Sequence, residues 1–181
     1  MSAERLVELL KELSATITTV ESCTGGYIIS TITDVEGASD ITPGGYVTYS
    51  NHQKLAIGIP EDIIEKYGVY SYECAKAMAV AGQKNTQADF SIGVTGTFTN
   101  IDLNNEGSEP GVVYFSIVFK AEQATAGKIN VPIMKRSDQK QFVTEIVLKR
   151  VLDVLESIHK ALLNLNVKIK HHTGTFDGLR V

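Results

Sequence analysis

One stretch constrains the fold more than any other: Thr19-Val20-Glu21-Ser22-Cys23-Thr24-Gly25-Gly26. A short, β-branched apolar run over residues 17–20 leads into it and is typical of a buried strand. The residues from about Gly25 to Thr33 read as a helix. Small hydroxyl, thiol and glycine residues therefore lie on a turn that connects a strand to a helix.

This turn has two interpretations. The first N–H groups of a helix have no internal partner and carry partial positive charge, so Thr24, Gly25 and Gly26 form a candidate site for a phosphate or an oxyanion. Glycine also lets a ligand approach the backbone closely. Ser22 or Thr24 could equally be an ordinary helix N-cap. Taken alone, the turn favours the ordinary N-cap, because serine and threonine occupy that position so often.

The composition indicates a globular chain and excludes several classes. The 181 residues suit one domain, which we assign to residues 1–165, with residues 166–181 as a C-terminal extension or tail. A net charge of −4 gives no electrostatic case for binding nucleic acid, and no apolar run is long enough to suggest a membrane partner. The start of the chain does not resemble a secretory signal, so we expect a cytoplasmic protein.

The cysteines and histidines point to no redox or metal chemistry. Cys23 and Cys74 are too few for a disulfide framework. Neither they nor the four histidines show the spacing of a metal site, so no metal is expected. Cys23 is expected to be a packed thiol, because the motif offers no neighbouring histidine to activate it.

The order of the elements indicates the fold class. Helices are predicted over residues 2–13, 25–33, around Lys54, from 60 to 68, over 71–86 and from 138 to about 165, and strands over 16–20, 46–50, 90–95, 111–119 and 127–134. Early alternation followed by a strand pair argues for an α/β fold, a three-layer α/β/α sandwich with a mixed, partly parallel sheet. In such sheets ligands bind at the loops beyond the carboxyl ends of the strands.

The segment Tyr49-Ser50-Asn51-His52-Gln53-Lys54 carries candidate catalytic groups. If a helix begins after Ser50, the phenol and the ammonium can face one cleft. A lysine in an apolar pocket becomes a usable base, a serine within its reach becomes a nucleophile, and a tyrosine can relay a proton. Spacing alone favours the plainer interpretation of a strand tyrosine and a solvated helix lysine.

Several motifs, taken in order, resemble the CinA C-terminal domain family. They are Glu21-Ser22-Cys23-Thr24-Gly25-Gly26, residues 33–39, residues 44–51 with Lys54, and Val94-Thr95-Gly96. The resemblance covers about residues 1–160 and implies an α/β sandwich that usually self-associates, so we expect a homo-oligomer, a dimer or higher. It also implies hydrolysis of nicotinamide mononucleotide to nicotinic acid mononucleotide and ammonia, with no metal or organic cofactor.

The family's functional positions fall on Ser22, Ser39, Tyr49, Lys54 and Thr95. The resemblance implies that Lys54, with Tyr49, takes a proton from the attacking hydroxyl and delivers it to the departing ammonia. We expect Ser39 to be the nucleophile and Ser22 to orient the substrate or donate to the oxyanion, because the Ser22 turn is also the candidate phosphate site. Ser22 stays open as the nucleophile, since an elbow-like turn exposes a hydroxyl well.

The chain departs from the family pattern in two places. The segment 97–110 lacks the family's Gly-Pro and lysine, and Gln139 stands where the family often has arginine, so that Arg136 or Lys140 could supply the charge. The expected substrate contacts are Thr24, Gly25, Gly26, Gly45, Thr95, Gly96 and Arg136. These departures keep two alternatives open: a catalytically weak or silent homologue that binds a pyridine nucleotide as a sensor, and an amidase of another small amide.

Overall fold

The computed structural model describes residues 2–105 and 107–173. In chain order, its elements are α1 (Ser2–Glu12), β1 (Ile17–Glu21), α2 (Tyr27–Thr33), the short 3-10 helix η1 (Ala38–Asp40), β2 (Gly44–Val47), α3 (Asn51–Ala56), α4 (Glu61–Tyr67), α5 (Tyr72–Thr86), β3 (Phe90–Gly96), β4 (Val112–Phe119), β5 (Glu122–Asn130) and α6 (Arg136–Thr173).

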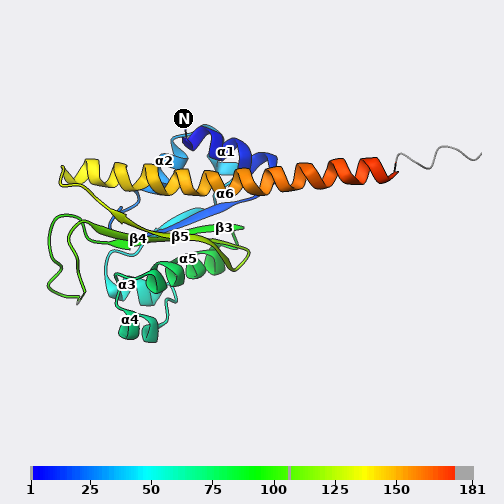
Figure 1. Ribbon diagram of the computed structural model, residues 1–181. Helices are drawn as coiled ribbons and strands as arrows, with labels where there is room; N and C mark the ends of the chain where they lie inside the picture. The colour runs from blue at the N-terminus through cyan, green and yellow to red at the C-terminus, as the bar shows by residue number, and fades with distance from the viewer. Residues whose placement is uncertain (1, 106, 174–181) are drawn as a thin grey trace, which may run out of the picture.

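The sheet has the order β2-β1-β3-β4-β5. The strands β2, β1 and β3 are parallel, and β4 and β5 continue the sheet with antiparallel pairing. Helices α1, α2 and α6 cover one face, while α5, with α3 and α4 beyond it, covers the other (Figure 1). The predicted three-layer α/β/α sandwich with a mixed sheet is therefore confirmed.

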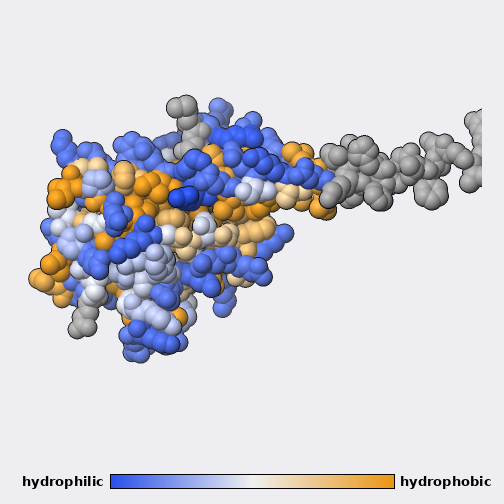
Figure 2. Space-filling view, in the orientation of Figure 1, coloured by the Kyte–Doolittle hydropathy of each residue, from blue (hydrophilic) through white to orange (hydrophobic). Residues whose placement is uncertain are grey.

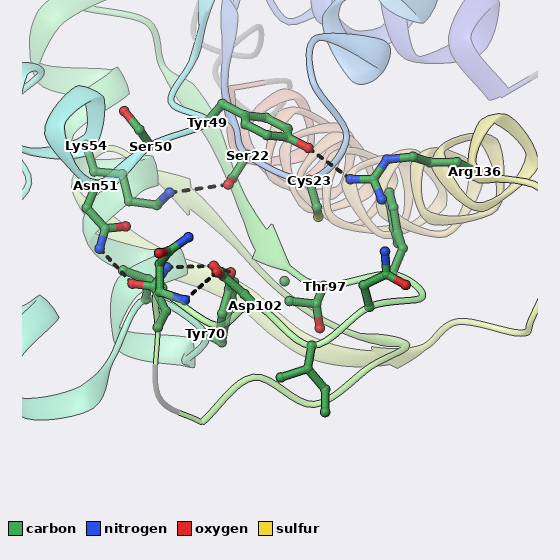
Figure 3. Close-up of a pocket in the computed structure, with 17 residues that line it drawn as sticks. Ser22, Cys23, Tyr49, Ser50, Asn51, Lys54, Tyr70, Thr97, Asp102 and Arg136 are labelled. Atoms are coloured by element: carbon green, nitrogen blue, oxygen red, sulfur yellow. Dashed lines mark hydrogen bonds between the residues drawn. The ribbon is translucent and has the colours of Figure 1, made fainter.

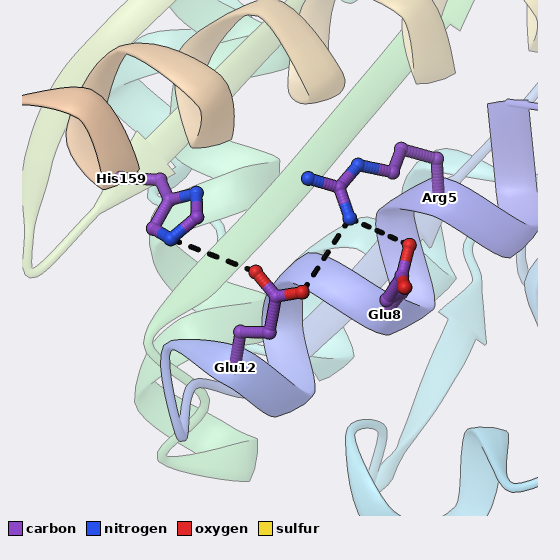
Figure 4. A network of polar contacts seen from close by, with 4 residues as sticks. All are labelled: Arg5, Glu8, Glu12 and His159. Carbon is purple, nitrogen blue, oxygen red and sulfur yellow. Dashed lines mark hydrogen bonds and ion pairs between the residues drawn. The ribbon is translucent and has the colours of Figure 1, made fainter. Parts of the chain in front are cut away.

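The larger part of the core lies between the sheet and the α1/α6 layer. Leu6, Leu9 and Leu10, at helical spacing on α1, are fully buried in one cluster with Val147 and Val151 of α6. At the edge of this layer Arg5 bridges Glu8 and Glu12 of α1, and His159 of α6 also contacts Glu12, which links the two helices through polar groups (Figure 4).

Small residues bring α5 close to the opposite face of the sheet. A Cβ on Gly93 of β3 would lie 2.0 Å from the carbonyl oxygen of Ala75, so only glycine allows this approach. Ala75, Met78 and Ala79 are fully buried, as expected for the packing face of the predicted 71–86 helix. The close approach of α5 holds β3, and with it the end of β3 at Gly96, in a fixed position.

Three element boundaries differ from the sequence prediction. The last strand is β5, Glu122–Asn130, rather than residues 127–134, because Lys120 and Ala121 form a tight turn with positive φ without a glycine to mark it. The strand predicted over residues 46–50 is β2 and ends at Val47. Helix α6 begins at Arg136 and continues to Thr173, beyond the predicted end at about Leu165; residues 174–181 of the predicted tail lie outside the described residues.

On the face shown in Figure 2, apolar residues lie in several places among the polar ones, including the start of α6. Apolar side chains gather along the far part of α6, where Leu162, Leu163 and Leu165 are about half exposed. Over residues 2–105 and 107–173, no helix is long and apolar enough to cross a membrane. The same residues contain no group of three or more histidine, cysteine or acidic side chains placed to hold a metal ion.

Candidate functional site

The Ser22 turn lies at the carboxyl end of the central strand β1. The backbone N–H of Ser22 donates to the carbonyl of Val94 at 3.0 Å, so the pairing of β1 with β3 continues into the first residue of the turn. Gly25 and Gly26 follow with φ of 62° and 91°, a conformation that glycine adopts most readily. Helix α2 begins only at Tyr27, so the turn is longer than the sequence predicts.

The start of α2 is already occupied by a carboxylate of the chain itself. Glu21 is fully buried and accepts hydrogen bonds from the backbone amides of Gly26 (3.0 Å), Ile28 (3.1 Å) and Ile29 (2.9 Å). A negative group at this position satisfies the orphan amides and complements the helix dipole. Within the expected phosphate site at residues 24–26, the amide of Gly26 is thus taken by Glu21 and that of Gly25 by the carbonyl of Ser22 at 3.1 Å, so neither is free for a phosphate.

Ser22 and Lys54 lie in direct contact. Helix α3 begins after Ser50, whose hydroxyl accepts from the backbone amide of Gln53 and caps the helix. This places Lys54 on the inner face of α3, with a side chain that is 2% exposed. Its Nζ donates to Ser22 Oγ at 3.2 Å and to the carbonyl of Thr48 at 2.9 Å (Figure 3).

The environment of Lys54 favours the neutral amine. Burial lowers the pKa of Lys54, because removal from water disfavours the charged ammonium. Cys74, Cys23 and, least of the three, Asp102 oppose this shift, but within the part of the chain that the structure describes no carboxylate forms an ion pair with Lys54. A buried, unpaired lysine with a lowered pKa can accept a proton from a neighbouring hydroxyl.

The two cysteines near the dyad are ordinary packed thiols. Burial raises the pKa of Cys23 to about 12 and that of Cys74 to about 11. Both are free and buried. They are protonated near neutral pH and poor nucleophiles, so the expectation that Cys23 is a packed thiol is confirmed.

The Ser22–Lys54 pair opens into a cavity of about 590 Å³ beyond the carboxyl ends of β1 and β3. Segments from five parts of the chain form its wall: the Ser22 turn, α3 and the residues before it, the approach to α5, the segment after β3 and the start of α6. Its lining residues are Ser22, Cys23, Tyr49, Ser50, Asn51, Lys54, Val69, Tyr70, Gly96, Thr97, Phe98, Asn100, Ile101, Asp102, Asn104, Asn105 and Arg136.

Tyr49 and Arg136 meet at another side of this cavity (Figure 3). Tyr49 is 62% exposed, and its hydroxyl accepts a hydrogen bond of 2.9 Å from Arg136 Nη2. The guanidinium of Arg136 also lies 5.3 Å from the centre of the Phe98 ring. The predicted relay between Tyr49 and Lys54 is therefore not formed here, whereas Arg136 does line the cavity.

Ser39 lies far from this site. It is exposed on η1, which precedes β2, and Ile41 at the end of η1 accepts a hydrogen bond from the backbone amide of Ile17 at the start of β1. Ser22 follows the opposite end of β1, about 17 Å away along a strand of five residues. The expectation that Ser39 attacks with Lys54 as its base is corrected, because within one chain the two groups are on opposite edges of the sheet.

Two of the expected substrate contacts, Thr95 and Gly45, have structural roles instead, and a third, Thr24, does not line the cavity. Thr95 is fully buried and its hydroxyl donates to the carbonyl of Val69 at 2.7 Å, which holds the approach to α5. A Cβ on Gly45 would lie 2.5 Å from Thr19 Oγ1, so this glycine serves close packing on β2, away from the cavity. Thr24 is fully buried and does not line the cavity, whereas Gly96 does.

Gln139, which stands where we expected the family's arginine, lies in the interior of the protein. Gln139 is buried, accepts from the Thr99 hydroxyl at 3.2 Å and donates to the carbonyl of Pro132 at 3.1 Å. Lys140 Nζ lies 3.0 Å from the position that a Cβ on Gly25 would take, outside the cavity lining. Of the two proposed substitutes for the arginine, Arg136 is the one at the cavity.

Sequence reasoning missed a network in the segment after β3. The carboxylate of Asp102 accepts from the Tyr70 hydroxyl and, at 2.6 Å, from Asn105 Nδ2. Asn105 in turn accepts from Asn51 Nδ2 of α3 at 2.7 Å. The backbone amide of Asn104 donates to Asp102 at 2.9 Å, a local turn that the Asp-Leu-Asn-Asn sequence could have indicated; the long-range contacts left no such signal.

The family model of the CinA C-terminal domain matches residues 1–156. This chain belongs to that family. A CinA-like protein of Thermotoga neapolitana is 44% identical over 94 residues, which is 51% of this chain but only 23% of that relative. The nicotinamide-nucleotide amidohydrolase PncC of Escherichia coli is 36% identical over 115 residues, covering 63% of this chain and 69% of PncC.

Solved structures agree with the fold. The crystal structure of a CinA superfamily protein from Klebsiella pneumoniae superposes with a TM-score of 0.79 at 18% sequence identity, covering 86% of this chain and 96% of that one. At this identity the likeness concerns the fold alone.

Proposed function

We propose that this chain is an amidohydrolase that converts nicotinamide mononucleotide to nicotinic acid mononucleotide and ammonia. The observation that carries the proposal is the 3.2 Å contact between Ser22 Oγ and the buried Nζ of Lys54 at a cavity of about 590 Å³. The similarity to PncC, whose name states this activity, supports the choice of substrate. Ser22, rather than Ser39, is the nucleophile in this proposal.

The first half of the reaction forms an acyl-enzyme. Neutral Lys54 takes the proton of the Ser22 hydroxyl as Oγ attacks the carboxamide carbon of the substrate, which the adjacent pyridinium makes more electrophilic. The backbone N–H of Cys23, directly after the nucleophile, is our candidate donor to the oxyanion. The Lys54 ammonium then gives its proton to the amide nitrogen, the C–N bond breaks, and ammonia leaves.

The second half restores the enzyme. Lys54, neutral again, takes a proton from water as the water oxygen attacks the acyl carbon. The second tetrahedral intermediate collapses, the bond to Ser22 Oγ breaks, and Lys54 returns the proton to Ser22. The products are ammonia and the carboxylic acid, which releases its proton to solvent as the carboxylate, and the lysine ends in its starting state.

The phosphate of the substrate needs a cation other than the start of α2. Arg136 is the guanidinium at the cavity, and its position against Tyr49 Oη and Phe98 holds it at one side. In our proposal Arg136 binds the phosphate, and Tyr49 orients the guanidinium rather than moving a proton.

The test is ammonia release from nicotinamide mononucleotide by the purified chain, with S22A and K54A as inactive controls and S39A as an active one. Release that S22A and K54A both lack supports the proposal. Binding of the nucleotide without release of ammonia favours the silent sensor. The departures from the family pattern at segment 97–110 and at Gln139 support that alternative. Neither binding nor release would direct the search to other small amides.

A further inference from the structure

The charges around the cavity are unevenly distributed. Among the described residues that line it, Asp102 has the only carboxylate, and Lys54 and Arg136 are the basic side chains. The Nζ of Lys54 is already engaged with Ser22 Oγ and with the carbonyl of Thr48. Asp102 and Arg136 are thus the charged side chains of the lining that lie outside the dyad, and they belong to different segments of the chain.

Asp102 lies on the side of the cavity that holds the dyad. It is linked through Asn105 to Asn51, and Asn51 and Lys54 are three residues apart on one face of α3. Figure 3 shows Asp102 and Tyr70 on the side of Asn51 and Lys54, with Arg136 on the opposite side. A ligand that reaches Ser22 with one end therefore has the carboxylate beside that end and the guanidinium beside the other.

The carboxylate is fixed and ionised. Hydrogen bonds from Tyr70, from Asn105 and from the backbone amide of Asn104 lower the pKa of Asp102 below its usual range. The same contacts hold it in one orientation, because they come from the approach to α5 and from within its own segment. A carboxylate that needs no rearrangement on ligand binding exerts its full field on the ligand.

We propose that Asp102 determines substrate specificity by selecting ligands whose ring next to the scissile amide carries a positive charge, while Arg136 binds the anionic group at the far end. The proposal rests on the function proposed above and deepens it. Nicotinamide mononucleotide has this order of charges, with a pyridinium at the carboxamide and a phosphate beyond the ribose. Its reduced form keeps the carboxamide, the ribose and the phosphate but has a neutral dihydropyridine ring.

The experiment compares the binding of these two forms by calorimetry in the S22A background, where no turnover disturbs the measurement. S22A should bind the cationic form more tightly than the neutral form. Adding Asp102→Asn should reduce this preference about five- to tenfold, because one charge–charge interaction is lost across a partly open cavity. Asp102→Glu, which keeps the charge, should retain most of the preference.

Two controls separate charge from architecture. Tyr70→Phe removes one of the hydrogen bonds to Asp102 but leaves the carboxylate with those from Asn105 and the backbone amide of Asn104, so it should retain most of the preference. Glu109→Gln removes a carboxylate of the same segment that pairs with Lys128 at 3.2 Å and does not line the cavity, and should leave the ratio unchanged.

An unchanged ratio in Asp102→Asn overturns the inference, as does an equal loss for both ligands, which would give Asp102 a structural role only. Failure of Asp102→Glu to retain the preference also counts against it. Ammonia release by the unmodified chain is measured in parallel. Release together with an unchanged ratio overturns this inference alone, whereas no release and no binding of either form overturns the proposed function and the inference with it.

Discussion

The two serines of the predicted site lie at opposite ends of the same parallel strands, in opposite surroundings. Ser22 follows β1 at the carboxyl end, beside a buried lysine, a buried carboxylate and a cavity. Ser39 precedes β2 at the amino end, where Lys11 and Asp40 form an exposed ion pair at 3.2 Å. Both ends thus have a serine, a lysine and an acid, yet only the Ser22 end removes them from water. Burial, rather than residue type, makes one of the two sets chemically useful.

The largest contrast is expected between Ser22→Ala and Ser39→Ala. Loss of the nucleophile should lower kcat for ammonia release by at least about 10³-fold, whereas loss of an exposed hydroxyl at the far edge should leave kcat within about twofold. Steady-state kinetics of both variants checks this. A larger loss of kcat in Ser39→Ala than in Ser22→Ala would mean that Ser39 belongs to an active site that a single chain does not form.

The lysines give the second contrast. Lys54→Met keeps the buried aliphatic volume but removes the base, and should lower kcat by about 10²- to 10⁴-fold while the fold survives. Lys11→Met removes one partner of an exposed ion pair and should leave turnover near that of the unmodified chain. Circular dichroism confirms that both variants fold. Substantial turnover by folded Lys54→Met would contradict the proposed mechanism.

The third contrast is between the acids Glu21 and Asp40, and it concerns the free energy of unfolding rather than turnover. Glu21→Gln leaves three backbone amides of the α2 start facing a neutral and partly donating group, and should reduce the free energy of unfolding by about 2 kcal/mol. Asp40→Asn breaks a surface pair and should cost less than about 1 kcal/mol. Urea denaturation measures both values. Equal losses would show that the burial of Glu21 contributes nothing to the cap.

The smallest effect is a pH dependence of stability. The pKa of Lys54 is lowered in the folded chain, so below its usual value of 10.5 the unfolded chain binds more protons at this site. Stability from this site therefore rises with pH between the lowered pKa and about 10.5. Relative to Lys54→Met, the melting temperature of the unmodified chain should therefore increase as the pH is raised toward 10.5.

The thiols of Cys23 and Cys74 titrate in the opposite sense, since burial raises the pKa of each above its usual value of 9.0. Both variants contain them, so they largely cancel in the difference between the two melting curves. Parallel pH profiles for the unmodified chain and Lys54→Met would mean that Lys54 is charged in the folded state.

The sequence predicted the parts of the site that depend on local pattern. The strand before Ser22 followed from its β-branched apolar run, and the helix that carries Lys54 begins after Ser50, as the sequence suggested. What the pattern could not supply was the distance between segments. Ser39 was misplaced because its position depends on the pairing of Ile17 with Ile41, which joins two segments that the sequence leaves independent.

The same limit applies to the polar partners that were missed. No residue near Glu21 in the sequence indicates that its side chain accepts hydrogen bonds from the start of the following helix. Fully buried glutamates are also rare, so the pattern does not suggest one. Tyr49 and Arg136 are 87 residues apart, and Tyr70 and Asp102 are 32 residues apart. Such contacts depend on how the layers pack, for which a single sequence has no signal.

The segment 97–110 joins β3 to β4, and these two strands are adjacent and antiparallel. A connection of this kind begins and ends at the same edge of the sheet, so residues can be inserted or removed there without shifting either strand. The Ser22 turn and α3 are covalently remote from it. In the function proposed above, selectivity and chemistry thus lie on separate segments of the chain, and exchanging residues 97–110 between relatives should change the binding preference while ammonia release is retained.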